Sequence, residues 1–291
     1  MINTNELTIQ IVLYEETKEL IFKCLEQLKN FKILILDNSS NKLLRDQILN
    51  KFHIKEYIHL NKNLGYSKGH NYLSNKVDTK YILILNADCQ IDETNIKNLL
   101  QSFIKYQDCG LISPTTFNDK FEQSYNGGLF FENQNQCEIT EISGDTCFQT
   151  VLGAAMLIEK KLFMGIQLFI DLGKFNENMF LFFSDYDLCK KIRKLNKSVI
   201  QTRSAKAFHI HGNSKVKNIL KKIYLREFNM TYDQLYYFNI NKLENILLKK
   251  LKKQHLNYLF KLILNLFIFR YSKFIYYFSR ISAYYKFLIK N

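Results

Sequence analysis

Two carboxylates stand shortly after apolar runs of this 291-residue chain, in positions where they could bind a metal ion and a phosphate. Asp37 follows the run 33–36, and Asp88 lies three residues beyond the run 81–85. Short apolar runs of this kind predict buried strands, and in an open α/β sheet ligands bind beyond the carboxyl ends of the strands. Mg²⁺ and Mn²⁺ take one or two carboxylates and leave further positions to substrate phosphates. These residues therefore predict a divalent cation beside a diphosphate.

Two further carboxylates, Asp185 and Asp187, follow the apolar run 179–183 and open a predicted helix. A single aspartate at such a place often caps a helix or forms a turn, which is the competing interpretation for each of the four. Their repeated occurrence at the ends of predicted strands and at a helix start favours a common site at one edge of the sheet.

The segment Asn63–Gly69, NLGYSKG, is a second candidate for a binding site, although it matches neither a Walker loop nor GxGxxG. Gly65 and Gly69 would let the backbone approach a ligand, and the helix that follows would offer N–H groups to anionic oxygens. An ordinary glycine turn before a helix is the alternative. Farther along, His209 and His211 could each be a metal or phosphate ligand, or be purely structural.

An alternation of strands and helices must position these side chains. The expected strands are 7–13, 32–36, 57–60, 81–85, 110–113, 150–159 and 199–201. Between the first strands apolar residues return at helical spacing, and this β-α-β order favours parallel pairing with right-handed connections. The predicted fold is α/β, with a Rossmann-like, mixed and mainly parallel sheet flanked by helices. The polar stretch 118–149 is expected to be a loop or hairpin insertion.

Positive charge is concentrated at the end of the chain. Residues 214–291 hold 16 lysines and arginines and three acids, a net charge of +13 out of +14 for the whole chain. They contain no glycine and no proline, so they predict a helical region after a domain that ends near residue 213. These basic, aromatic-rich helices could pack as a subdomain, rest on anionic lipid or bind nucleic acid, and their many large apolar residues favour lipid over nucleic acid.

No segment predicts a membrane span. The best apolar run, 262–269, is closed by Lys261 and Arg270, whereas a span needs about 18 residues. The N-terminus has no charged and apolar leader, and the six cysteines form no CxxC pair and no metal-type spacing. Reduced thiols and a cytoplasmic location are therefore expected.

Taken in order, these segments resemble family 2 glycosyltransferases of the GT-A fold, and in particular their rhamnosyltransferase-like bacterial members. The resemblance runs from residue 7 to about residue 214. Six motifs carry it, namely ILILDNSS, NLGYSKGHN, YILILNADCQID, VLGAAMLI, FNENMFLFFSDYDLCKKIRKLNKSV and FHIHGNS. It implies that residues 1–213 form a GT-A nucleotide-sugar-binding catalytic domain and that residues 214–291 form a helical extension.

On the donor side, the resemblance implies a nucleoside-diphosphate sugar, a dTDP- or UDP-sugar such as dTDP-rhamnose. Asp37 would contact the nucleotide base or ribose. Asn63, Gly65 and Gly69 would shape the nucleotide-sugar pocket. Asp88 would contact the diphosphate through the divalent cation, Mg²⁺ or Mn²⁺.

For catalysis, the resemblance implies an inverting transfer to a hydroxyl of a glycan or lipid-linked acceptor, at the inner face of the plasma membrane. Asp185 would be the general base, with Asp187 as the competing residue. Asp88 would hold the metal together with His211, or with His209 in its place.

Three positions depart from the family pattern, and one of them, Glu15, stands where the family usually has an asparagine, so the resemblance implies no role for it. Asn86 stands where the metal motif often has a second carboxylate, and Ser184 replaces the acid that usually precedes the base.

A sugar-phosphate nucleotidyltransferase would share the metal site, but residues 14–16 are Tyr-Glu-Glu where that class has a basic, glycine-rich loop. A non-catalytic nucleic-acid-binding protein would explain the basic tail, but no recognition motif accompanies it, so no nucleic-acid partner is expected.

Overall fold

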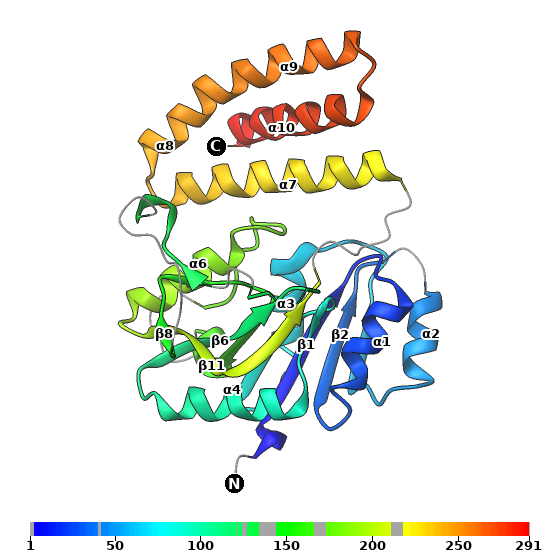
Figure 1. The fold of residues 1–291 in the computed structure, drawn as a ribbon, viewed down its shortest axis with the longest axis vertical. Coiled ribbons are helices and arrows are strands. Elements are labelled where there is room, and N and C mark those ends of the chain that lie inside the picture. Colours follow the sequence, from blue (N-terminus) through cyan, green and yellow to red (C-terminus); the bar gives the residue numbers. More distant parts are fainter. Residues whose placement is uncertain are drawn as a thin grey trace. The chain divides into compact units, whose positions relative to one another are not determined.

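The computed structural model describes residues 3–39, 42–120, 122–123, 127–133, 144–165, 173–210 and 218–290. The chain falls into two compact units, one of residues 1–176 and 185–215 and the other of residues 177–184 and 216–291. The first unit holds the sheet, and the second holds the C-terminal helices (Figure 1).

The first unit is built on a sheet with the strand order β3-β2-β1-β4-β10-β6-β11-β5. Its strands are β1 (Leu7–Leu13), β2 (Lys32–Asp37), β3 (Glu56–His59), β4 (Tyr81–Asn86), β5 (Cys89–Gln90), β6 (Cys109–Phe117), β10 (Ala155–Glu159) and β11 (Ser198–His209). Strands β3, β2, β1 and β4 are parallel, β10 runs antiparallel between β4 and β6, and β11 is parallel to β6. Outside this order, β8 (Thr146–Cys147) pairs with β11, and β7 (Gly127–Gly128) pairs with β9 (Thr150–Val151).

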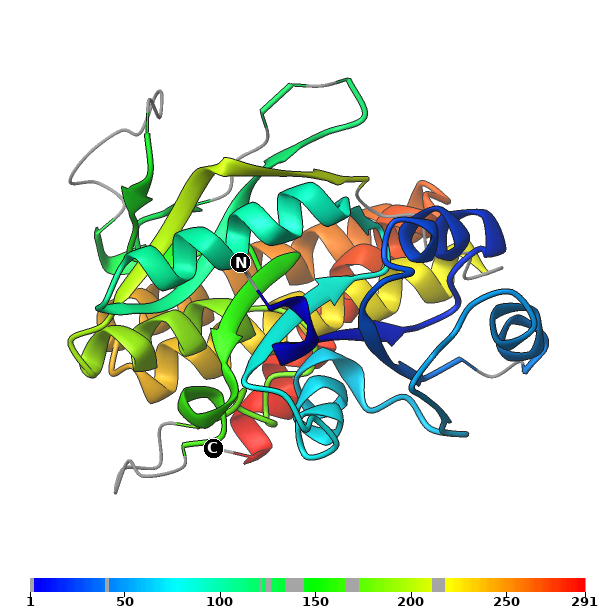
Figure 2. The same cartoon turned by 90° about the horizontal axis from the view of Figure 1, so that it is seen from below.

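Helices cover both faces of this sheet. They are α1 (Lys18–Glu26), α2 (Leu43–Leu49), α3 (Gly65–Ser74), α4 (Glu93–Lys105), α5 (Lys160–Phe163) and α6 (Ser184–Lys194), with short 3₁₀ turns η1 (Thr4–Glu6) and η2 (Phe131–Asn133). Leu83 and Leu85 of β4 pack in the core with α1 and α4, whereas Ile82 and Ile84 pack with α3, α5 and α6. Figure 2 shows these two sets of helices on opposite sides of the sheet. The predicted α/β fold, a mixed sheet flanked by helices, is confirmed.

Several strands differ from the sequence-based expectation, and β6 extends from the expected 110–113 to Cys109–Phe117. Strand β11 is much longer than the expected 199–201, because a bulge between Thr202 and Lys206 lets a partly polar segment continue to pair with β6. The expected strand 150–159 is interrupted, since β9 ends at Val151 and β10 begins at Ala155. Strand β9 pairs with β7 in a separate two-stranded sheet, so this segment enters the main sheet only at β10.

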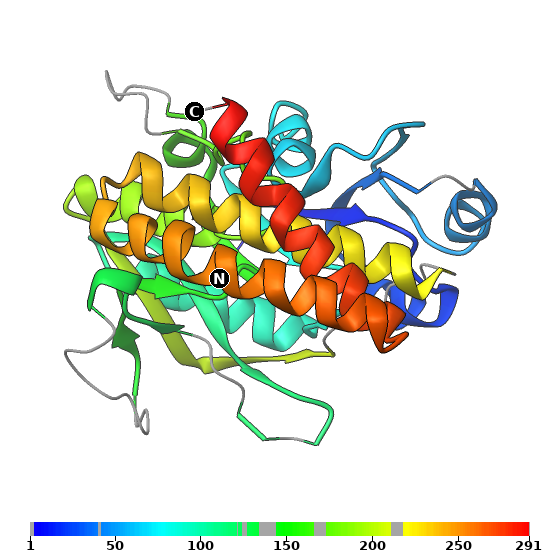
Figure 3. The same ribbon diagram turned by 90° about the horizontal axis from the view of Figure 1, so that it is seen from above.

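The second unit is helical, as predicted for the C-terminal region. It contains α7 (Ile219–Ile240), α8 (Glu244–Lys249), the π-helical turn η3 (Lys250–Gln254), α9 (His255–Phe267) and α10 (Tyr271–Lys290). Helix α10 packs against both α7 and α9 (Figure 3). Large aromatic side chains, among them Tyr237, Tyr284 and Phe287, are buried in this unit. Within the described ranges, no helix has the length and apolar character that crossing a membrane would require.

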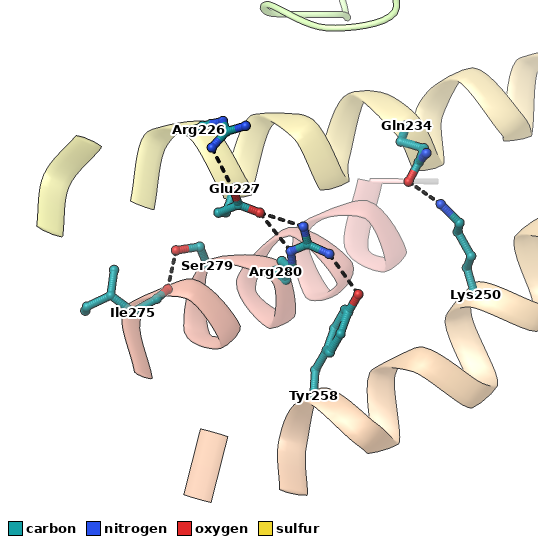
Figure 4. Close-up of polar contacts among 8 residues, drawn as sticks. All are labelled: Arg226, Glu227, Gln234, Lys250, Tyr258, Ile275, Ser279 and Arg280. Atoms are coloured by element: carbon teal, nitrogen blue, oxygen red, sulfur yellow. Dashed lines mark hydrogen bonds and ion pairs between the residues drawn. The ribbon is translucent and has the colours of Figure 1, made fainter. Parts of the chain in front are cut away.

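Arg280 joins the three long helices of this unit through an ion pair with Glu227 and a hydrogen bond to Tyr258 (Figure 4). The Arg280 guanidinium on α10 donates to Glu227 Oε2 on α7 at 2.9 and 2.7 Å, and to the Tyr258 hydroxyl on α9 at 2.8 Å. Its central carbon lies 4.4 Å from the centre of the Tyr276 ring. The Glu227 side chain is only 8% exposed, so its charge depends on this partner for compensation.

A buried carboxylate on α7 holds the irregular segment 177–183, directly before α6. Asp233 Oδ1 accepts a hydrogen bond from the backbone N–H of Phe180 at 3.0 Å, and Oδ2 accepts from those of Leu181 and Phe182 at 2.9 Å. Burial raises the pKa of Asp233 to about 6, although these three donors act in the opposite direction. The segment thus takes from one side chain the partners that a strand or helix would otherwise provide.

Candidate active site

Asp88 and His209 meet because β5 pairs with the end of β11. In that antiparallel pairing Cys89 lies opposite His209, and the backbone N–H of Ile210 donates to the Asp88 carbonyl at 3.0 Å. His209 Nε2 lies 3.1 Å from Asp88 Oδ1. The Asp88 side chain remains 19% exposed, whereas that of His209 is 6% exposed. His211, the other candidate ligand, lies outside the described residues.

One carboxylate and one imidazole are a small donor set for a cation. Within the part of the chain that the structure describes, no group of three His, Cys, Asp or Glu residues could hold a metal ion. Mn²⁺ accepts carboxylate oxygen, and imidazole nitrogen is a ligand for many divalent ions. Asp88 and His209 therefore fit a divalent cation that takes its remaining ligands from a diphosphate and water.

Asp185 is held at the start of α6 by two backbone donors. Its Oδ2 accepts a hydrogen bond from the Gly153 N–H at 3.0 Å, and its Oδ1 accepts one from the Tyr186 N–H at 2.9 Å. Burial raises the pKa of Asp185 above its ordinary value, and these two N–H groups partly offset that rise. Asp187, by contrast, forms an ion pair with Lys191 one turn along the helix, at 2.8 Å. The two carboxylates therefore differ in their partners.

The break between β9 and β10 connects three of the candidate segments. The Gly153 carbonyl accepts a hydrogen bond from the Tyr66 hydroxyl at 2.8 Å, while its N–H binds Asp185. The next carbonyl, that of Ala154, accepts from the backbone N–H of Asn86 at 2.8 Å. Residues 153–154 thus join the start of α3, the end of β4 and the start of α6, and Asp88 lies two residues beyond Asn86.

The loop before α3 is fastened to the end of β2. The Leu64 N–H donates to Asn38 Oδ1 at 3.1 Å, and the Gly65 N–H donates to Asn63 Oδ1 at 2.8 Å. Gly65 has a φ of +76°, a conformation that side chains rarely adopt. The sequence analysis assigned no role to Asn38. The only indication of this contact was the position of Asn38 directly after Asp37.

Gly69 faces the sheet. A Cβ at this position would lie 2.9 Å from Val12 Cγ2, a methyl group of β1. Gly69 therefore allows α3 to approach the sheet closely, and so it sets the position of the loop in front of the helix.

Asp37 is fully buried at the end of β2 and is held by β3. Its Oδ1 accepts from the Ser39 N–H at 2.8 Å, and its Oδ2 accepts from the Tyr57 hydroxyl at 2.7 Å. His59 Nδ1 lies 3.4 Å from the same Oδ2. Burial, and next the Asp37 charge, raise the pKa of Tyr57, so its hydroxyl stays a donor. Sequence reasoning missed Tyr57 and His59, although both belong to a predicted strand next to that of Asp37.

The sequence matches the model of a known protein family and part of one characterised protein. The family model described as Glycosyl transferase family 2 matches residues 8–160. A teichoic acid poly(glycerol phosphate) polymerase of Staphylococcus epidermidis is 31% identical over 119 residues. That match covers 38% of this chain and 16% of the polymerase, so the chain corresponds to a small part of this relative.

Three solved structures resemble the fold at low sequence identity. GalNAc-T7 with UDP, GalNAc and Mn²⁺ has a TM-score of 0.55 and 14% identity, over 70% of this chain and 43% of the other. A mannosyltransferase of Pyrobaculum calidifontis, PcManGT, in complex with GDP-Man and Mn²⁺ has a TM-score of 0.55 and 10% identity, over 81% and 64%. S. aureus TarS 1–349 has a TM-score of 0.53 and 12% identity, over 98% and 92%. These similarities confirm the predicted GT-A fold.

Proposed function

The chain belongs to glycosyl transferase family 2, and from this premise we propose that it transfers a sugar, with inversion at the anomeric carbon, from a nucleoside-diphosphate sugar to an acceptor hydroxyl. The observation that carries the proposal is Asp185, a partly buried carboxylate that two backbone N–H groups orient and whose pKa burial raises. Such a carboxylate suits a general base, because a base works best when its pKa approaches the operating pH.

In the proposed reaction, Asp185 takes the proton from the acceptor hydroxyl while that oxygen forms its bond to the anomeric carbon. The bond between this carbon and the diphosphate oxygen breaks on the opposite side, and the nucleoside diphosphate leaves. Asp88 and His209 would hold a divalent cation, which would neutralise the charge of the leaving diphosphate. Asp187 is assigned no proton transfer, because its charge is paired with Lys191.

The donor and the acceptor are proposed from the resemblance and the relatives together. We propose a dTDP- or UDP-sugar donor, with rhamnose as the first sugar to test, and a cell-wall or lipid-linked glycan as acceptor. The name of the S. epidermidis relative, a teichoic acid polymerase, supports a role in the synthesis of a cell-wall polymer. GalNAc-T7 and PcManGT, solved with UDP or GDP-Man and with Mn²⁺, support a nucleotide-sugar donor in general and a divalent cation.

We propose that the two regions predicted from the sequence have different functions. Residues 1–213 would bind the nucleotide sugar and perform the transfer. Asp37 would contact the nucleotide, and Asn63, Gly65 and Gly69 would shape the pocket, Gly69 by setting the position of the loop before α3. Residues 214–291 would bring the chain to its acceptor at the inner face of the plasma membrane. Direct participation of His211 in the cation site, next to or in place of His209, belongs to the same proposal.

A pair of matched variants tests the base. Asp185→Asn should keep nucleoside diphosphate binding and lose about 10²- to 10⁴-fold in transfer rate, since positioned proton transfer contributes that much. Asp187→Asn should retain most of the rate. Binding is measured as thermal stabilisation by UDP, dTDP and GDP with and without Mn²⁺, and turnover as release of nucleoside diphosphate. Wild-type turnover by Asp185→Asn would overturn the assignment, and absence of stabilisation by every nucleotide in the wild type would overturn the donor class.

A further inference from the structure

Helix α9 exposes a row of large apolar side chains to solvent. Five exposed residues recur at the spacing of one helix face, and we call them the α9 ridge: Leu256, Phe260, Ile263, Leu264 and Phe267. Their exposed fractions run from 45% to 73%. Most helices of water-soluble units present the reverse arrangement, because exposing apolar surface to water costs free energy.

The opposite face of α9 makes the contacts within the unit. His255 lies against Tyr284, and Tyr258 receives the hydrogen bond from Arg280. Asn265 is the one buried residue of α9. Polar and aromatic groups thus contribute to the packing of α9 on α10, whereas the α9 ridge stays largely exposed in this unit.

The charged side chains in the sequence around the α9 ridge are all positive. From residue 245 to the end, the chain carries ten lysines and arginines and no Asp or Glu. Lys253 is exposed just before α9, and Arg270 and Lys273 are exposed just after it. An exposed apolar face flanked by cations matches the chemistry of an anionic lipid surface, in which acyl chains lie beneath negative headgroups.

We propose that the α9 ridge inserts into the headgroup region of an anionic membrane, with α9 lying in the plane of the surface. Helix α9 continues from α8 and η3, but lysines interrupt the apolar character of this run, and no described helix is long and apolar enough to cross a bilayer. An amphipathic helix of this kind can lie in the interface. Nucleic acid would satisfy the cations and leave the leucine and phenylalanine side chains in water, so lipid is the partner that uses both features. The inference stands on the helical unit alone and does not depend on sugar transfer.

Tryptophan fluorescence gives a direct test, because the chain contains no tryptophan. Full-length Phe267→Trp should shift its emission to the blue with phosphatidylcholine vesicles that contain about one third phosphatidylglycerol. Ile104→Trp, at a residue that is 54% exposed on α4, is the matched control and should keep its water-exposed emission. Unshifted emission of Phe267→Trp on bound protein would show purely electrostatic adsorption and overturn the insertion.

Vesicle sedimentation of the full chain without donor gives the second test. Phe260→Ser with Phe267→Ser should weaken binding on the order of 10- to 100-fold, as expected for two large apolar groups that no longer leave water. Leu43→Ser with Ile104→Ser, which removes exposed apolar residues elsewhere, should bind as the wild type does. Equal binding by the ridge variant, or retention of the wild type by DNA but not by vesicles, would overturn the proposal. Because no donor is present, failure here is distinguishable from failure of the proposed transfer.

Discussion

The backbone N–H of Gly153 donates to Asp185 Oδ2 at 3.0 Å, so the residue that orients the candidate base has no side chain of its own. A Cβ at position 153 would lie 3.2 Å from both Cβ and Oδ2 of Asp185, and 3.3 Å from the Tyr66 hydroxyl. These distances are tighter than ordinary contacts. Glycine is therefore needed here for space, since its φ does not lie in the left-handed region.

Gly153→Ala should lower kcat about 10-fold or more while leaving the fold intact, because the added methyl group must displace the carboxylate or the tyrosine. Steady-state kinetics and thermal unfolding measure the two effects. Gly144→Ala is the matched control, since nothing lies within 4 Å of its Cβ position. Unchanged kcat in Gly153→Ala would mean that the carboxylate position does not limit the reaction.

His209→Ala should raise the Mn²⁺ concentration needed for nucleoside diphosphate binding by about 10- to 100-fold, since the imidazole either binds the ion or orients Asp88. Titration calorimetry with Mn²⁺ at a fixed UDP concentration measures the change. His53→Ala removes an exposed histidine and should have no effect. If both variants bind alike, His211 becomes the remaining histidine for this role.

Asp233 should make the chain more stable as the pH falls from 7 towards 5. Its folded pKa of about 6 lies above the ordinary value near 3.9, so the folded state binds the proton more tightly. The cost of the buried charge is present above pH 6 and is relieved as the pH falls through 6.

Asp233→Asn should remove this pH dependence and cost about 1–3 kcal/mol at pH 7, because the amide cannot accept all three N–H groups. Urea unfolding at pH 5 and 7 measures both effects. Glu244→Gln, at an exposed acid of the same unit, should follow the wild-type profile. The same pH slope in Asp233→Asn would contradict the assignment.

Arg280→Lys should destabilise the helical unit by about 2 kcal/mol, because lysine cannot reproduce the contacts to both Glu227 and Tyr258. Arg226→Lys serves as control, since Arg226 is 69% exposed and lies 3.9 Å from the same glutamate. Its effect should stay within about 0.5 kcal/mol. Chemical unfolding followed by circular dichroism compares the two, and equal losses would remove the special role of Arg280.

The sequence alone determined the features that repeat locally along the chain. Apolar runs predicted most of the strands, such as Leu7–Leu13, and the glycine-free, basic C-terminal region predicted its helices. The ordered motifs predicted the family, because each carries its own pattern of apolar, glycine and acidic residues. These patterns can be read from a short stretch of sequence, because the burial and the backbone freedom of neighbouring residues select their types.

Only the tertiary structure decided which of these side chains meet. His209 and Asp88 are 121 residues apart and come together through the register of β5 on β11, across a bulge that the sequence did not reveal. The resemblance named Asp185 as the base with Asp187 as a competitor, and only the fold places Gly153 beside Asp185 and Lys191 beside Asp187. Partners so distant leave no periodic signal, because their meeting depends on sheet order and strand register, which the whole chain sets together.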